Sequence, residues 1–327
     1  MNVSYDELKR HFKRVLISLA FSETKADCCA GIFAANSRDG VYSHGLNRFP
    51  VFVDYIMQGL VDPSAEAKRV AQHGLIEIWD GHRGAGMYNA HLCMDKAIRL
   101  AKEKSMACVV LRNNNHWMRG GTYGLMAAEA GCIGICFTNA IASMAPWGGN
   151  EPRLGNNPLV IAIPYQEQPI LLDMAMSQFS YGKMQEYELA NKMLPVDGGY
   201  DLQGNLSRDP ALIRKNKSAL PIGFWKGSGL ALVLDVLLTV LGNGPSTASI
   251  TASGKEVGLS QCFICLHPDV LHNEAMEEII QFTKSATPSE PGEKITYPGE
   301  RMFAIRRKNE KDGIPVDEKI WKAVKEM

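Results

Sequence analysis

The sequence has no excess of charge of either sign. Its 327 residues include 35 basic and 35 acidic side chains, so the formal net charge is zero. No run of five or more lysines and arginines occurs. Nucleic acids and anionic membranes are bound through such basic patches, so this composition argues against both as the main partner. We expect a small molecule instead.

The sequence also has little that would export the protein or hold it in a membrane. Its N-terminus, MNVSYDELKRHFKRVL, has no apolar signal core and predicts an amphipathic helix capped by Ser4 and Glu7. The most apolar stretch, 229–242, is shorter than the roughly 20 residues of a membrane span and contains Asp235. It predicts a buried core helix. Eight cysteines without an export signal favour reduced thiols and a cytoplasmic location.

Several catalytic motifs are absent. The chain has no H-E-x-x-H, no G-x-S-x-G and no G-x-x-x-x-G-K-[ST], which argues against metal hydrolysis, serine acyl transfer and P-loop phosphoryl transfer. Cys262 and Cys265 form a C-x-x-C, but they lie in the apolar run CFICL, which predicts a strand. Residues three apart on a strand point to opposite faces, so we expect no metal site there or elsewhere.

Helical and strand patterns alternate along most of the chain. Helices are predicted at 4–20, 22–38, 47–58, 87–105, 178–191, 226–241, 272–283 and from 317 onward, and strands at 74–80, 107–111, 132–138, 159–163, 169–174 and 260–266. Residues 192–222 are polar and glycine-rich, and predict a long loop suited to a lid or a partner contact. The fold class is therefore α/β, of mixed type, with helices clustered at both chain ends.

The segment GHRGAG, 81–86, imitates the phosphate-binding turn of a Rossmann unit, because it follows a strand and precedes a helix. Asn89 stands where the last glycine of G-x-G-x-x-G belongs, and no acidic residue ends the next strand. Turn glycines ahead of a helix explain this loop more simply.

Two polar clusters are candidates for chemistry. In YSHGLNRFP, 42–50, His44 and Arg48 lie in a glycine-flanked turn. Histidine exchanges a proton near neutral pH and arginine grips both oxygens of a carboxylate, which fits interconversion of 2-oxo and 2-hydroxy acids. In RNNNHWMRGGTYG, 112–124, His116 and three asparagines follow an apolar strand and can bind oxygen atoms. The alternative for the first cluster is an ordinary polar surface loop. The alternative for the second is a hydrogen-bonded turn in which His116 only satisfies a backbone carbonyl.

The chain resembles the malate/L-lactate dehydrogenase family, whose members lack a Rossmann fold. The blocks that carry the resemblance are SHGLNR (43–48), NHWMRGGTYG (115–124), GCIGICFTN (131–139), GNNP (155–158), LDM (172–174), GK (182–183), KGSGLALVLDVLLTVLG (226–242) and PGE (298–300). Many relatives have Phe-Gly in place of Trp117-Met118. The resemblance implies a helical part over 1–72, a cofactor-binding sheet domain over 73–284, and a segment, 285–327, that returns to the helical part.

The resemblance also implies roles for individual residues. His44 would be the general acid, while Arg48 and His116 would orient the substrate's carboxylate and neighbouring oxygens. A nicotinamide cofactor, NAD with NADP as the alternative, is expected against a set of twelve residues: Gln168, Pro169, Ile170, Leu171, Leu172, Asp173, Met174, Phe224, Trp225, Ala304, Ile305 and Arg306.

The residues alone say less about the cofactor. Asp173 ends an apolar strand, and Phe224 with Trp225 offers a flat surface to a ring. The basic run 306–308 could meet the ribose 2′-phosphate of NADP.

The function implied by the resemblance is NAD-dependent reduction of a 2-oxo sugar acid. It would take place in a homodimer whose cofactor cleft the partner chain completes. Malate, lactate and ureidoglycolate are alternative substrates. A sugar-acid-binding protein without turnover is the alternative from another class.

Overall fold

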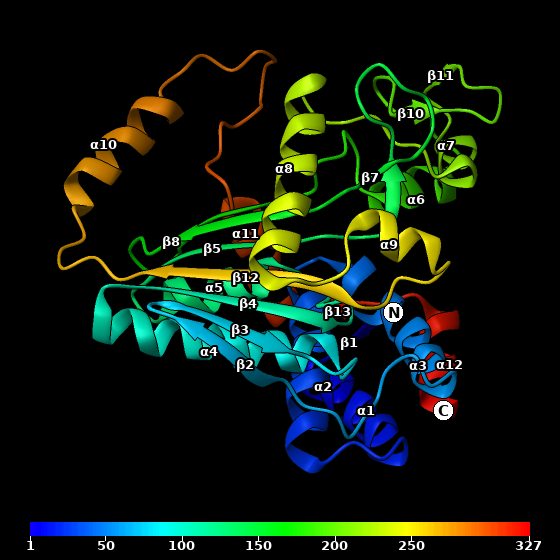
Figure 1. The fold of residues 1–327 in the computed structure, drawn as a ribbon. Coiled ribbons are helices and arrows are strands. Elements are labelled where there is room, and N and C mark those ends of the chain that lie inside the picture. Colours follow the sequence, from blue (N-terminus) through cyan, green and yellow to red (C-terminus); the bar gives the residue numbers. More distant parts are fainter.

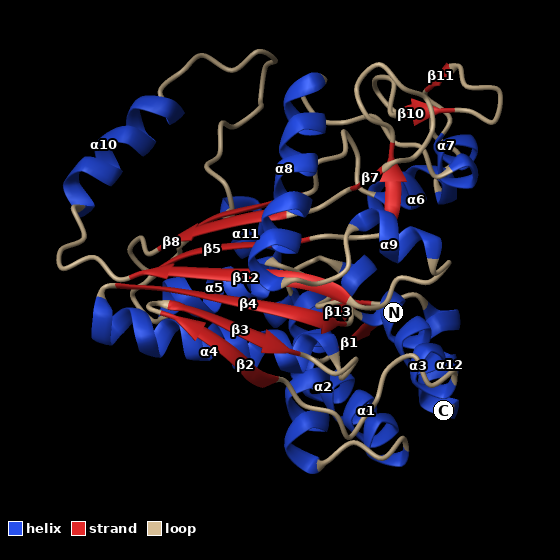
Figure 2. Cartoon of the chain, viewed as in Figure 1, coloured by secondary structure: helices blue, strands red, loops and turns tan.

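The computed structural model describes all 327 residues, and its centre is one seven-stranded sheet (Figures 1 and 2). The strand order is β2-β3-β4-β12-β5-β8-β9. These strands are β2 (Lys68–His73), β3 (Ile76–Asp80), β4 (Met106–Asn114), β5 (Ile133–Thr138), β8 (Leu159–Ile163), β9 (Ile170–Met174) and β12 (Leu259–Leu266). Only β3 and β4 pair in parallel. A single parallel pair does not make a doubly wound Rossmann sheet, so the mixed α/β, non-Rossmann class is confirmed.

Helices cover both faces of this sheet. On one face α4 (Gly86–Lys104) and α5 (Gly121–Glu129) share a core with the strands, and on the other face α8 (Trp225–Gly242) does (Figure 1). Strand alternation places Cys265 in the first core and Cys262 in the second, as predicted. All eight cysteines are free thiols, and no cluster of metal-ligating side chains occurs.

A helical layer at one end of the sheet is built from both ends of the chain. It contains α1 (Tyr5–Ser18), α2 (Glu23–Arg38), α3 (Phe49–Met57) and the C-terminal α12 (Glu318–Glu326), and the two termini lie near each other (Figure 1). Strand β1 (Asn2–Val3) pairs with β13 (Ile314–Pro315). The shared core includes Phe12, Phe33 and Trp321. The division of the chain into three parts stays a prediction.

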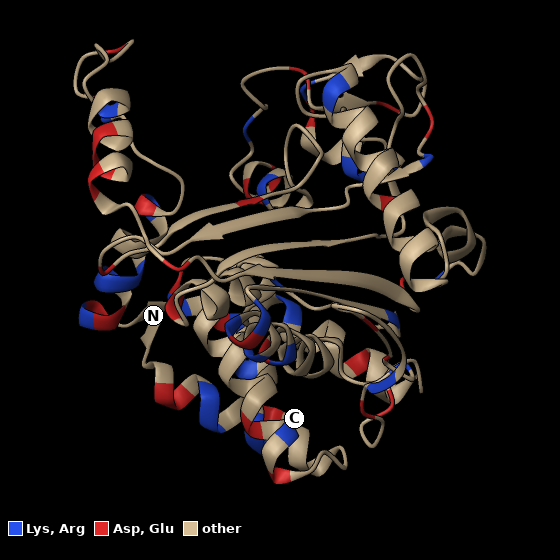
Figure 3. Ribbon diagram, turned by 60° about the vertical axis from the view of Figure 1, so that its left-hand side comes forward, with Lys and Arg blue, Asp and Glu red and all other residues tan.

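Charged side chains lie mostly on the helices and loops, and strands β5, β8 and β12 of the sheet contain none (Figure 3). Predicted helix starts are confirmed where a polar side chain caps them. Ser4 Oγ accepts a hydrogen bond from the Glu7 amide at 3.1 Å, and Asp317 caps α12. Pro50 lies in the first turn of α3, and Gly59, which ends the segment, has a φ of 68°.

The prediction of a long loop at 192–222 is wrong. The segment contains the hairpin β10 (Gly199–Tyr200) and β11 (Leu206–Ser207) and the helix α7 (Pro210–Asn216). It packs beside α6 (Tyr181–Leu189) around a small core of Met184, Leu194, Ile213 and Ala219. These elements are too short for hydrophobic periodicity to reveal them.

The prediction that 229–242 is a buried core helix is also wrong. Only the inward face of α8 is buried, and its outward face exposes Leu232, Val233, Val236, Leu237 and Val240. A helix that is apolar all round has no periodic pattern to show that one side is uncovered. By length and composition alone α8 could cross a membrane. Here it packs on the sheet, and its Asp235 accepts hydrogen bonds from Asn139 Nδ2 and the Thr247 amide.

Several elements had no clear signal in the sequence. They are β2, α5, α9 (Thr247–Ala252), α11 (Glu300–Asp312), the pair β6 (Ala142–Met144) and β7 (Leu154–Gly155), and two 3₁₀ turns, η1 (Tyr42–His44) and η2 (Leu46–Arg48). Two glycines begin α5, and α11 is strongly charged with no capping side chain. The remaining predictions, including α10 (Asn273–Lys284), hold to within a few residues.

The junction of the two chain ends gives a first prediction. Trp321 is 1% exposed and its ring lies 5.0 Å from that of His11 on α1. Replacing it with alanine should lower the free energy of unfolding by about 3–5 kcal/mol, because a large buried ring is lost. Urea titration measures this. Lys322→Ala, whose side chain is 76% exposed, is the matched control and should change stability by less than about 0.5 kcal/mol. Equal losses in the two variants would contradict the shared core.

Candidate active site

The two polar clusters picked out from the sequence meet at one cavity. This cavity has a volume of about 480 Å³ and lies between η1, the loop that follows β4, strand β9 and the start of α11. The rings of His44 and His116 stack across it, with centroids 5.8 Å apart and planes inclined by 23°. Other polar residues on its wall are Ser43, Arg119, Thr138, Asn139, Asn156, Asp173, Ser180 and Arg301.

The end of α2 holds the turn that carries His44. Asn36 Nδ2 donates a hydrogen bond to the His44 carbonyl oxygen at 3.0 Å, and Ser37 Oγ accepts one from the Leu46 amide at 2.9 Å. A Cβ on Gly45 would lie 2.2 Å from Ser37 Oγ. The residue after His44 is therefore glycine because the turn packs directly against α2.

The His44 ring has the contacts of a proton-exchanging group. Ser43 Oγ lies 3.0 Å from Nδ1, which leaves Nε2 for a ligand. Burial lowers the pKa of His44 to about 4, with Asp173 opposing the shift and Arg48 and Arg119 adding to it. The free protein thus holds this imidazole neutral near pH 7. An anion bound beside it would favour the protonated ring.

His116 is suited to a different task. Its Nδ1 accepts a hydrogen bond from the Met118 amide at 3.0 Å, so the neutral ring carries its hydrogen on Nε2. Burial, with the positive charge of Arg48 and the neighbouring His44, lowers the pKa of His116 well below its ordinary value. His116 is therefore a fixed hydrogen-bond donor, while His44 can change its protonation state.

Arg48 lies in a small pocket that adjoins the main cavity. His116 and Met118 line both spaces and separate them. The small pocket is also lined by Val51, Phe52, Tyr55, Val61 and Asn115. The Arg48 guanidinium nitrogen Nη2 is 3.6 Å from Glu256 Oε2. Burial raises the pKa of Glu256, and the charge of Arg48 opposes this. In the free chain the predicted carboxylate clamp is thus paired with an internal carboxylate.

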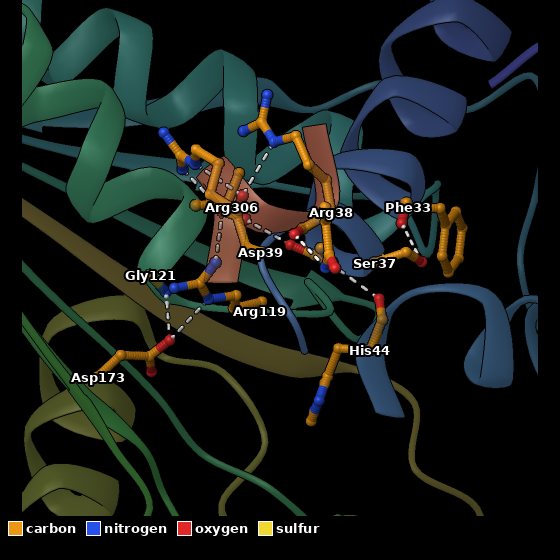
Figure 4. Close-up of polar contacts among 12 residues, drawn as sticks. Phe33, Ser37, Arg38, Asp39, His44, Arg119, Gly121, Asp173 and Arg306 are labelled. Atoms are coloured by element: carbon orange, nitrogen blue, oxygen red, sulfur yellow. Dashed lines mark hydrogen bonds and ion pairs between the residues drawn. The ribbon is translucent and has the colours of Figure 1, made fainter. Parts of the chain in front are cut away.

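Asp39 joins the walls of the cavity (Figure 4). Arg306 donates to both of its oxygens, at 2.8 and 2.7 Å, and Arg38 and Arg119 donate one bond each at 3.0 Å. Burial alone would raise the Asp39 pKa, but the hydrogen bond from Arg306 and the arginine charges lower it. Arg119 also lies 3.3 Å from Asp173 Oδ2, which accepts the Gly121 amide at 3.0 Å.

The residues predicted to bind the cofactor fall into two groups. Leu171, Asp173 and Ile305 line the cavity. The other nine do not: Gln168, Pro169, Ile170, Leu172, Met174, Phe224, Trp225, Ala304 and Arg306. Strand alternation explains why neighbouring β9 residues differ, and the Arg306 guanidinium is bound to Asp39. Phe224 and Trp225 are each 64% exposed, at the start of α8.

The cavity has the features that a nicotinamide dinucleotide needs. Trp117 and Leu171 supply an apolar wall for a flat ring. The start of α11 lies on the wall through Gly299 and Arg301, and Arg301 pairs with no carboxylate. A helix N-terminus beside a free guanidinium suits phosphate. The individual cofactor contacts remain predictions.

Sequence reasoning missed four residues at or near this site. They are Ser43, Asp39, Arg119 and Glu256, which contact His44, one another or Arg48. Ser43 and Arg119 lie inside the motif blocks quoted above, so proximity to a candidate histidine was a usable signal. Nothing local to Glu256 indicates its pairing with a residue more than 200 positions away.

Comparison with known proteins identifies the family. Residues 3–325 match the family model described as malate/L-lactate dehydrogenase. The chain belongs to the malate/L-lactate dehydrogenase family. It is therefore an oxidoreductase, of a family that uses nicotinamide cofactors.

Curated relatives and solved structures match over almost the full length. The 2,3-diketo-L-gulonate reductase of Haemophilus influenzae is 45% identical over 334 aligned positions, with 100% of both chains covered. The enzyme of that name from Escherichia coli K12 is 44% identical with the same coverage. Malate dehydrogenase from Entamoeba histolytica superposes with a TM-score of 0.94 at 28% identity, covering 100% of this chain and 96% of that one. Sulfolactate dehydrogenase from Methanocaldococcus jannaschii gives 0.88 at 29%, with the same coverage.

The depressed pKa of His44 predicts how stability depends on pH. Between its unfolded value of about 6.5 and its folded value of about 4, the unfolded chain binds a proton that the folded chain does not. The free energy of unfolding should therefore fall as pH drops through this window. The ring partly faces the cavity, so we expect His44 to account for on the order of 2 kcal/mol.

Urea titration at several pH values tests this, with His44→Asn as the comparison. The variant should lose less stability between pH 6.5 and 4 than the wild type. Another buried histidine, His91, contributes equally in both proteins because His44 does not affect its pKa. Identical pH dependence of the two would contradict the neutral, buried state of His44.

Proposed function

We propose that the protein reduces 2,3-diketo-L-gulonate to 3-dehydro-L-gulonate with NADH. The observation that carries the proposal is the pair of stacked, neutral imidazoles of His44 and His116 beside Asp173 in one cavity. The full-length identity of 44–45% to reductases of that name supports this substrate. Malate, lactate and ureidoglycolate remain alternative substrates for the same site. A sugar-acid-binding protein without turnover is the alternative of another class.

In this proposal each side chain has one task. A bound nicotinamide cofactor supplies the hydride. His44 donates a proton from Nε2 to the substrate's carbonyl oxygen while Ser43 holds Nδ1. His116 donates a hydrogen bond from Nε2 to a neighbouring substrate oxygen. Arg48, which lies in the small pocket next to His116, attracts the substrate's carboxylate through its positive charge.

Substrate binding would also favour protonation of His44. His44 is held neutral by burial and by two nearby guanidiniums, so the free site has little tendency to be protonated near pH 7. A substrate carboxylate brings the negative charge that favours the imidazolium. The general acid would then be charged chiefly when there is a carbonyl to receive its proton.

NAD is the proposed cofactor, with NADP as the alternative. The reason is that Arg306, the first of three consecutive basic residues, forms an ion pair with Asp39 and so does not offer its guanidinium to a phosphate. Arg307 and Lys308 are exposed and have no ion-pair partner. A solvated pair of this kind is weak support for a ribose 2′-phosphate site.

The activity is tested by oxidation of NADH with a panel of 2-oxo acids that includes 2,3-diketo-L-gulonate. His44→Asn should lower kcat by roughly 10²–10⁴-fold, the usual loss for a general acid. Binding of NADH, followed by fluorescence, should survive, because asparagine removes the proton donor without a large change in shape.

The matched control is His11→Asn, a partly buried histidine on α1 that packs on Trp321 outside the cavity. It should keep wild-type turnover. Near-normal kcat in His44→Asn would show that His44 is not the general acid. Ligand binding without NADH oxidation for every acid in the panel would favour the binding protein.

We further propose that the active form is a cytoplasmic homodimer. Eight free thiols suit a reducing compartment. The outward residues of α8 at 232, 233, 236, 237 and 240 recur with helical spacing and form one apolar face, 41–75% exposed. Such a face normally marks a protein–protein contact. Phe224 and Trp225 lie at the start of the same helix, so a partner docked along α8 would cover them.

Light scattering tests both whether the dimer forms and which surface of the chain makes the contact. The wild type should have twice the chain mass of 36.0 kDa. Val240→Glu, at a 75% exposed position on α8, should dissociate it and lower activity, because a charge would be buried in the contact. Val196→Glu, at a 50% exposed position in the 192–222 segment, should remain dimeric. Dissociation by Val196→Glu alone would transfer the contact to that segment.

A further inference from the structure

We propose that Met118 is a specificity-determining residue that limits the space at the carboxylate end of the substrate. It would do so by separating the main cavity from the pocket that contains Arg48. The proposal deepens the 2-oxo acid reductase function argued above and rests on it.

The backbone at Met118 has an unusual conformation. Its φ is 66°, in the left-handed region that side chains with a Cβ rarely occupy. Such a conformation persists only where the surroundings impose it, and it occurs preferentially at functional sites. A glycine would adopt this φ without strain. The methionine side chain therefore lies at a position where glycine would give a less strained backbone.

The same residue fixes one of the two cavity histidines. The Met118 amide donates the 3.0 Å hydrogen bond to His116 Nδ1 that leaves Nε2 as the donor toward a ligand. This contact belongs to the backbone, so it can survive removal of the side chain. The role of the side chain can thus be tested apart from the orientation of His116.

The side chain itself forms a partition. It is 4% exposed, packs in the core of the helical layer and lines both the main cavity and the small pocket. The small pocket measures about 10 Å³, which is barely the room that one water needs. With the side chain in place, the small pocket has no room for any substrate group larger than about one water.

The pocket behind Met118 is mostly apolar, because Val51, Phe52, Tyr55 and Val61 line it, so it would accept an ethyl group if it were opened. Arg48 and Asn115 also line it, and Asn115 Oδ1 is buried without a hydrogen-bond partner. The amide nitrogen of Asn115 already donates to the backbone at Leu60, Arg83 and Gly84. Removing the Met118 side chain would join this pocket to the main cavity.

Two unreactive isomers test the proposal by binding to the NADH-loaded protein. Ethyl oxamate carries its extra ethyl group at the carboxylate end of the 2-oxo acid analogue oxamate, and N-ethyloxamate carries it at the other end. Dissociation constants of all three, from calorimetry, are compared between variants. Comparing each ethyl derivative with oxamate in the same protein separates the effect of the mutation from the missing charge of the ester, ethyl oxamate.

In Met118→Gly and Met118→Ala the ratio of the ethyl oxamate constant to the oxamate constant should fall by roughly tenfold or more, the effect of one or two methylenes in a pocket. The ratio for N-ethyloxamate should stay within about twofold of the wild-type ratio. Alanine keeps the strained φ and glycine relieves it, so agreement between them assigns the effect to the side chain. Met118→Leu, of similar volume, should retain the wild-type ratios.

Unchanged ethyl oxamate ratios in folded Met118→Gly and Met118→Ala would overturn the proposal. A gain for N-ethyloxamate in place of ethyl oxamate would overturn it too, because Met118 would then bound the other end of the substrate. If the wild type binds no oxamate with NADH present, the 2-oxo acid function itself fails, a result that needs no variant. Thermal unfolding of each variant verifies that the compared proteins are folded.

Discussion

The geometry of the cavity depends on one buried carboxylate, that of Asp39. It follows α2, and its three guanidinium partners come from α2, from the loop before α5 and from α11. Asp39 is only 4% exposed, so the loss of any strong partner would leave buried charge uncompensated. Through Arg119 the constraint extends to Asp173 on β9. The helical layer, the sheet and α11 are thereby held in one arrangement around His44.

The charge around the two histidines couples proton binding to anion binding. Arg48 and Arg119 disfavour a positive charge on His44, and only Asp173 opposes them. Arg48 is partly neutralised by Glu256, whose Oε2 lies 3.6 Å from Arg48 Nη2. The net effect of the charges around His44 is therefore to disfavour the protonated ring, and a substrate carboxylate would offset this. In the proposed reaction, His44 would then be protonated when a substrate carbonyl oxygen lies beside it.

Some features that depart from local rules lie at the proposed functional surfaces. Met118 and Phe224 both have positive φ, one beside His116 and the other at the start of α8. Helix α8 exposes a continuous apolar face that a monomer would be expected to cover. Natural sequences break such rules where function requires it and compensate elsewhere, as the well-packed core around Met118 illustrates.

The sequence by itself determined the helices and strands whose periodicity is strong, the caps at Ser4 and Asp317, and His44 and His116 as candidate site residues. These depend on local propensity and spacing, which a single chain displays directly. Tertiary structure alone decided that Arg48 pairs with Glu256, that Arg306 is bound to Asp39 and that α8 is half uncovered. The partner of a charge and the covered side of a helix are set by contacts between distant segments. No local pattern records those contacts.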